Sequence, residues 1–143
     1  MKLQTLVLSR VLFVVIAIAI LILLSSVNPR PVKSDEVSLK YNPMTESAVT
    51  GVVEDVQVFP CSLSAGLGTH LALRNDSGPL IVHVVPSGFL ASHELIVANG
   101  DQVKIVGSKV RYRGADALIA REITMRNQTF IFRRPDGKPL WEE

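Results

Sequence analysis

The sequence predicts an all-β domain, a small closed barrel of five to six strands with one short helix between the third and fourth strands. A transmembrane or signal helix is expected before it. Apolar and polar residues alternate through much of residues 46–143, which is the pattern of strands half-buried in a sheet. Short clusters of turn residues separate these segments. The one long apolar stretch, residues 11–24, lies near the start.

The N-terminal segment, residues 1–27, is predicted to be a signal anchor or a signal peptide. Its apolar stretch is short for a bilayer span, which needs about 20 residues. Leucines stand where a signal-peptidase site prefers small residues, so we favour an uncleaved anchor. The expected location is the bacterial inner membrane, as a single-pass protein with its C-terminal domain exported. A cleaved leader would instead release the domain into the periplasm.

A linker is predicted over residues 28–45, because Pro29 and Pro31 favour extended chain. The barrel domain is expected over residues 46–143. Its first strand, 48–59, changes the face of its apolar residues at Glu54, which predicts a β-bulge at Glu54–Asp55.

The remaining elements follow in order. The turn sequence NDSG joins two strands, 69–76 and 79–85, into a hairpin, and residues 86–100 contain a short helix or turn. The fourth strand, 102–113, changes face at Gly107–Ser108 and is predicted to bend there. Two further strands are predicted, over 117–127 and 129–134.

Two bent strands and a helix between strands three and four match the five-stranded OB-fold order, so the predicted barrel is OB-like. Four segments, VTGVVEDVQVF, HLALRNDSGPLIVHVVP, GDQVKIVGSKV and LIAREI, resemble the bacterial OB-fold proteins of the cell envelope, the BOF-type group. This resemblance covers about residues 46–141. It implies the barrel fold and an exported location, and it implies no activity.

Charge argues against a dedicated nucleic-acid binder. The chain has 15 basic and 13 acidic residues, of which four basic and two acidic lie in residues 1–36. Residues 37–143 therefore carry 11 of each and lack the broad basic surface that nucleic-acid binding needs. No hydrolase, P-loop or zinc-protease motif occurs, so no enzymatic activity is predicted.

The lone cysteine suggests a metal site. Cys61 is expected to end the first strand and His70 to open the second, so both lie near one loop. His83, on the strand paired with the second, is expected nearby. A thiolate with one or two imidazoles suits zinc or copper, and a thioether such as Met44 or Met125 would favour copper(I). The alternative is a buried thiol beside hydrogen-bonded histidines. His93 is expected at the surface.

A second candidate site is the ligand-binding face of an OB-fold, where Arg74, Lys109, Arg111 and Arg113 offer positive charge. The predicted strands two and three contain no aromatic residue for base stacking, which disfavours an oligonucleotide. Trp141, the only tryptophan, is predicted to pack over an open end of the barrel.

The sequence thus favours a non-enzymatic, membrane-tethered accessory domain that binds an envelope protein partner or a small ligand. The first alternative is a copper or zinc handling module built on Cys61 and His70. The second is a binder of oligonucleotides or oligosaccharides.

Overall fold

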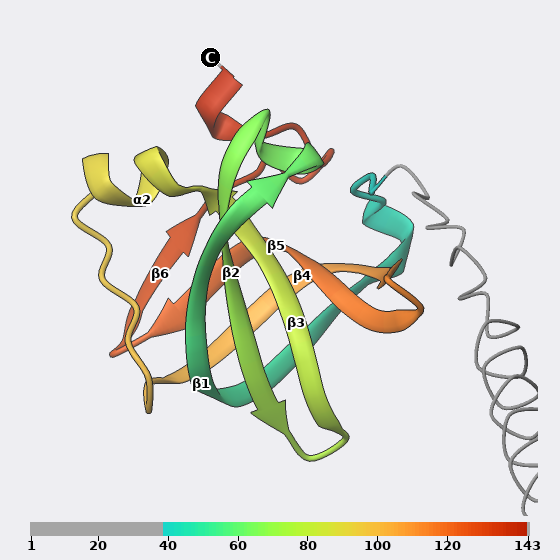
Figure 1. The fold of residues 1–143 in the computed structure, drawn as a ribbon, viewed down its shortest axis with the longest axis vertical. Helices are drawn as coiled ribbons and strands as arrows, with labels where there is room; N and C mark the ends of the chain where they lie inside the picture. Colours follow the sequence, from blue (N-terminus) through green and yellow to red (C-terminus); the bar gives the residue numbers. More distant parts are fainter. Residues whose placement is uncertain (1–38, 143) are drawn as a thin grey trace, which may run out of the picture. The chain divides into compact units, whose positions relative to one another are not determined.

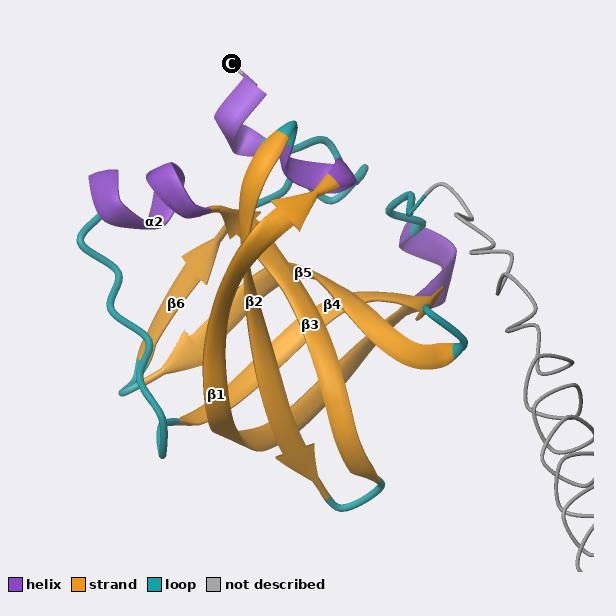
Figure 2. Cartoon of the chain, viewed as in Figure 1, coloured by secondary structure: helices purple, strands orange, loops and turns teal. Residues whose placement is uncertain are grey.

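A computed structural model describes residues 39–142, and it confirms the all-β class. Figure 1 shows strands that curve around a common interior, with short helical turns at their ends, and Figure 2 separates strands from helices by colour. The six strands are β1 (Glu46–Cys61), β2 (Gly66–Asn75), β3 (Gly78–Pro86), β4 (Gln102–Tyr112), β5 (Ala115–Met125) and β6 (Gln128–Ile131). The helical elements are η1 (Pro43–Thr45), η2 (Ser62–Ser64), α2 (Ser87–Ser92) and η3 (Leu140–Glu142).

The strand pairings link five strands in a cycle. The sheet order is β3-β2-β1-β4-β5-β6, and β3 also pairs with β5 in parallel, at Ile81↔Ala117 and the next two positions. The other neighbouring strands pair antiparallel. β1 serves two partners, because Glu46 to Val52 pairs with β4 and Val52 to Cys61 pairs with β2.

The bulge predicted in β1 is confirmed, whereas the bulge predicted in β4 was wrong, because the extra residue at that register shift is Arg121 of β5. In β1 the register shifts between Val53 and Asp55, and in the β4–β5 ladder it shifts between Val106 and Gly107. A Cβ atom on Gly107 would lie 2.3 Å from the Ile119 carbonyl oxygen. Glycine at this position therefore permits the close approach of two backbones at the bend.

The interior is filled by aliphatic side chains from β1 to β5, as the alternating pattern predicts. It is continuous with Leu95 from the segment after α2 and with Phe132 after β6. The side chains less than 1% exposed are Leu71, Leu73, Val82, Ile105, Ile119, Ala120 and Ile123. Trp141 and Phe89 pack against this core, which agrees with the predicted packing of Trp141.

Some predicted boundaries were wrong. β2 begins at Gly66 instead of Thr69, so His70 lies inside the strand instead of opening it. β6 ends at Ile131, and Arg133 forms only an isolated bridge with Pro139 as the chain turns back. This turn directs η3 across the end of the sheet where β1 and β2 are joined (Figure 1).

The predicted N-terminal helix, residues 1–27, lies outside the described residues, as does most of the predicted linker. Within residues 39–142, no helix has the length and apolar character needed to cross a membrane.

Candidate metal centre

Cys61, His70 and His83, here called the Cys–His cluster, come together at one end of the sheet. Cys61 is the last residue of β1, and His70 and His83 are directly opposed partners in the β2–β3 ladder. Opposed residues of an antiparallel pair place their side chains side by side. One ligand atom from each of the three residues lies within 4.8 Å of the others. The structure therefore brings together all three residues that the sequence proposed as metal ligands.

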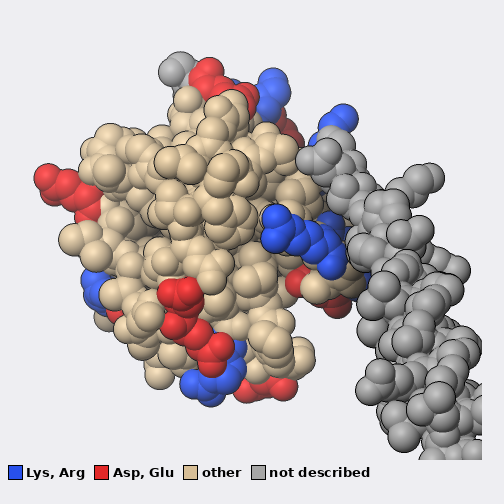
Figure 3. Space-filling model, viewed as in Figure 1, with Lys and Arg blue, Asp and Glu red and all other residues tan. Residues whose placement is uncertain are grey.

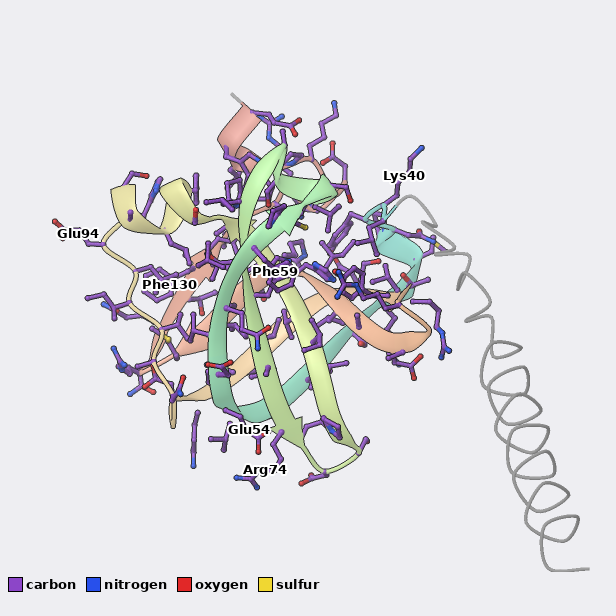
Figure 4. All side chains as sticks on the ribbon, viewed as in Figure 1. Lys40, Glu54, Phe59, Arg74, Glu94 and Phe130 are labelled. Carbon is purple, nitrogen blue, oxygen red and sulfur yellow. The ribbon has the colours of Figure 1, made fainter. Side chains whose placement is uncertain are left out.

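Packing fixes the orientation of both imidazole rings. His70 is 1% exposed and stacks on Phe59, with ring centroids 3.6 Å apart and an interplanar angle of 6°. His83 is 2% exposed and meets His70 and Tyr112 edge-on, each at 4.7 Å between centroids. Figure 4 labels Phe59, whose ring marks this region. Such packing pre-organises the ring nitrogens, because little side-chain entropy remains to be lost when they bind a ligand.

Three of the four ring nitrogens have no hydrogen-bond partner among the described residues. They are both nitrogens of His70 and Nε2 of His83. Nδ1 of His83 lies 3.7 Å from Cys61 Sγ. Buried polar atoms without partners are rare and cost about 1–3 kcal/mol each. The nitrogens of the cluster are therefore candidates for binding a ligand.

Burial keeps both histidines neutral. It lowers the pKa of His70 to about 4, although the backbone of Gly68 opposes this effect. Burial, together with the charge that His70 would carry, lowers the pKa of His83 to about 4. Neutral imidazole is the form that binds metal ions, so at neutral pH no proton must leave either ring.

Gly68 supplies the space that the cluster needs. A Cβ atom there would lie 2.7 Å from Ser64 Oγ, 2.9 Å from Cys61 Cβ and 3.2 Å from His70 Cε1. The β2–β3 register also shifts between Gly68 and His70, which sets the position of the His70 ring relative to β3. The sequence analysis missed Gly68, although the pair of glycines flanking Leu67 was a visible signal.

A narrow pocket surrounds the cluster. Its walls come from η2, β2, β3 and the C-terminal turn, and they include two residues that the sequence analysis did not connect with the cluster, Arg133 and Trp141. The other lining residues are Leu63, Ser64, Thr69, Val84 and Val85. The side chains pack too closely to admit a molecule as large as water in this arrangement. The pocket thus suits an atomic ion better than an organic ligand.

The donor set fits zinc or copper. One sulfur and two imidazole nitrogens bind these metals at about 2.0–2.3 Å and leave a fourth tetrahedral position open. Ligand atoms around such an ion lie roughly 3.3–3.8 Å apart, so separations of up to 4.8 Å require only small side-chain movements. The thioethers suggested for copper(I) do not line this pocket, since Met44 is 91% exposed and Met125 lies in the hydrophobic core.

The basic residues of the second candidate site do not form one group. Arg74 lies near the β2–β3 turn and pairs with Glu54 at 2.7 Å (Figure 4), whereas the other three belong to the β4–β5 hairpin. There Arg111 pairs with Asp116 at 2.7 Å, and Arg113 lies over the Tyr112 ring. In the face shown in Figure 3, acidic and basic side chains are scattered between uncharged areas. His93 is exposed, as expected, and stacks on Phe89.

Comparison with known protein families assigns the chain to one of them. The sequence model of the MamS/MamX magnetosome protein family matches residues 45–130. The chain belongs to this family. The MamS/MamX match gives no support for the BOF-type group in particular, although the all-β class implied by that resemblance is confirmed. No curated protein matches the chain. The MamS/MamX segment contains the whole Cys–His cluster and ends before Arg133 and Trp141.

Proposed function

We propose that this chain is a non-enzymatic accessory domain of the magnetosome that binds one zinc or copper(I) ion through Cys61, His70 and His83. The observation that carries the proposal is the convergence of one thiol and two buried imidazoles whose nitrogens have no other partner among the described residues. Membership of a magnetosome accessory family supports the accessory role.

The proposed chemistry is binding and delivery of a metal ion. The metal would satisfy the buried nitrogens, and the thiol would release one proton as it becomes a thiolate ligand. The neutral state of both imidazoles favours uptake at neutral pH. The narrow pocket supports a metal ion as the first ligand, because in this arrangement of side chains it admits no molecule as large as water.

The same proposal includes an OB-like barrel tethered to a membrane. The cyclic order of five strands, with α2 between β3 and β4, supports the barrel. The apolar residues 11–24 support the tether, with the described domain on the exported side. A protein partner in the envelope remains a prediction. Binding of an oligonucleotide or oligosaccharide also remains a prediction, and two of its four candidate arginine and lysine side chains already hold ion pairs.

Metal titration tests the proposal. The full chain is purified in detergent without chelator, its metal content is measured, and zinc and copper(I) are titrated against competing chelators. We expect one ion per chain and a loss of affinity of about 100-fold in Cys61→Ser or His83→Asn, since each removes a ligand. Iron(II) should bind more weakly than zinc, following the general order of divalent metals.

The matched control is His93→Asn, because His93 is an exposed histidine outside the cluster. It should leave affinity unchanged. Circular dichroism of each variant checks that the fold is retained. Absence of stoichiometric binding in the wild type would contradict the proposal, and so would equal affinity in the wild type and Cys61→Ser.

A further inference from the structure

Arg133 is a buried cation that lines the same pocket as the Cys–His cluster. Arg133 is 5% exposed, and no carboxylate within residues 39–142 forms a salt bridge with it. Its Nη1 donates to the Gly137 carbonyl oxygen at 3.1 Å, whereas its Nε has no hydrogen-bond partner. Its guanidinium carbon lies 4.6 Å from the centroid of the Trp141 ring and 5.5 Å from that of Tyr41.

This arrangement is costly as it stands. Burying an ion without a paired charge is unfavourable, and cation–π contacts with the Trp141 and Tyr41 rings offset only part of that cost. Burial lowers the pKa of Arg133, and the negative charges that Tyr41, Glu142 and Cys61 can carry oppose this effect. Guanidinium remains charged in proteins, so an anion bound beside Arg133 would offset this cost.

The position of Arg133 indicates where such an anion would lie. Arg133 lines the same pocket as the Cys–His cluster. Three protein ligands leave one coordination position of the metal to an outside group. A metal ion and a guanidinium facing one pocket both attract an anion with more than one oxygen atom.

We propose that the metal held by Cys61, His70 and His83 and the guanidinium of Arg133 together bind a small carboxylate, which fills the open metal position and accepts a hydrogen bond from Arg133 Nε. This inference rests on the proposed metal site. It assigns to Arg133 a role in selecting the anion that binds together with the metal.

Entry of the anion requires movement of Trp141. The pocket is too narrow for a carboxylate while the indole lies on Arg133. Trp141 belongs to η3, a three-residue turn held to the sheet by the Leu140 N–H, which donates to the Phe132 carbonyl oxygen at 2.9 Å. Outward movement of this turn would exchange a cation–π contact for a charge-assisted hydrogen bond. Because Trp141 is the only tryptophan, its fluorescence reports this movement.

The test measures how acetate changes zinc affinity. Zinc is titrated into the full chain in detergent, at fixed ionic strength, with either perchlorate or acetate as the anion and with correction for zinc acetate in solution. We expect acetate to raise zinc affinity at least tenfold in the wild type and to shift the Trp141 emission. Arg133→Gln should bind zinc with no acetate effect.

The matched control is Arg113→Gln, because Arg113 also lies against an aromatic ring, at 5.1 Å from the Tyr112 centroid, but is exposed. It should keep the full acetate effect. Arg133→Lys retains the charge without the planar group and serves if Arg133→Gln does not fold. It should show a reduced acetate effect.

The outcomes separate the two proposals. Zinc binding that depends on Cys61 but not on acetate would support the metal site and overturn the anion inference. An acetate effect in Arg133→Gln equal to that in the wild type would also overturn the anion inference. If zinc does not bind, the proposed function fails. The anion site is then judged on metal-free protein: an acetate-dependent Trp141 emission change that is absent in Arg133→Gln supports it, and no change overturns it.

Discussion

Two polar clusters lie within the described domain, and they are built in opposite ways. In the first, here called the arginine cluster, Arg121 bridges Glu46 and Glu122 with N–O distances of 2.7 and 2.9 Å. A second nitrogen of Arg121 reaches Glu46 at 3.3 Å, and the Tyr41 hydroxyl donates to the same carboxylate. In the Cys–His cluster and the adjoining Arg133, by contrast, four nitrogens are buried without partners.

This contrast separates a structural element from a candidate site. The arginine cluster joins β1 to β5, and its charges neutralise one another, as expected for polar groups that stabilise a fold. Hydrogen bonding from Arg121 lowers the pKa of Glu46, and burial with the Glu46 contact raises that of Tyr41. The unpaired groups of the Cys–His cluster and Arg133 are buried more deeply, so they weaken the fold. Natural proteins tolerate such a loss of stability mainly where a ligand binds.

Acid should reveal the largest difference between the two clusters. The pKa values of His70 and His83 fall from an ordinary 6.5 to about 4 on folding, so the unfolded chain binds more protons in between. Stability is then fully present above pH 6.5 and is lost as the pH falls toward 4. Each unit of lowered pKa corresponds to about 1.4 kcal/mol, so we expect the metal-free protein to lose several kcal/mol across this window in urea unfolding.

The arginine cluster should respond at lower pH. The pKa of Glu46 is lowered from 4.5, so its stabilising contribution is lost only as the pH falls below that value. His70→Leu should therefore flatten the slope between pH 6.5 and 4 and leave the steeper loss below it. A slope in the upper window that is unaffected by His70→Leu would contradict this assignment.

The next largest effect should come from breaking the arginine cluster. Arg121→Met leaves Glu46 and Glu122, whose side chains are each 24% exposed, without a counter-ion. We expect a loss of about 2 kcal/mol in the free energy of unfolding at pH 7, between the values for surface and buried pairs. Arg111→Met is the matched control, because its ion pair is highly exposed and should contribute little. Equal losses in both variants would show that the arginine cluster is no more important than a surface pair.

The smallest expected effect is a gain, not a loss, in the free energy of unfolding. His70→Leu removes two buried nitrogens that lack partners and keeps an apolar side chain against Phe59. In the metal-free protein we expect a gain of about 1 kcal/mol, since the cost of unmet hydrogen bonds disappears. Zinc affinity should fall sharply in the same variant. The exposed His93→Leu should change neither quantity, and a loss of stability in His70→Leu would mean that His70 has a structural role.

The bulge of β1 could be predicted because it depends on local sequence: a pair of acidic residues interrupts the alternation there. The second register shift was assigned to β4 at Gly107, whereas its extra residue, Arg121, belongs to the neighbouring strand β5 and gave no such local signal. The end of β6 was harder, because Phe132 continues the apolar pattern although the backbone leaves the ladder there. An apolar pattern indicates burial, and a buried residue need not lie in a strand.

The candidate site could be predicted only in part, because sequence shows the chemistry of its residues but not their contacts. Cys61, His70 and His83 were found because their chemistry suggests metal binding at any location. Their direct contact depends on the β2–β3 register, which the turn after Asn75 sets. Arg133 was missed because an arginine in a segment rich in proline and glycine is normally exposed. Only the return of the chain through Gly137, whose φ is +88°, brings it into the interior.

The divided pairing of β1 has a consequence for the order of folding. Its second half pairs with β2 across a short connection, as at Cys61↔Gly66. Its first half pairs with β4, which lies much later in the sequence, as at Glu46↔Ser108. Ordering this short loop costs less entropy than closing the much longer one between β1 and β4, whose nearest paired residues are Val52 and Gln102. We therefore expect β1, β2 and β3 to associate as a local meander first. All three residues of the Cys–His cluster lie on that meander, so a metal ion could nucleate the domain before its last strands are in place.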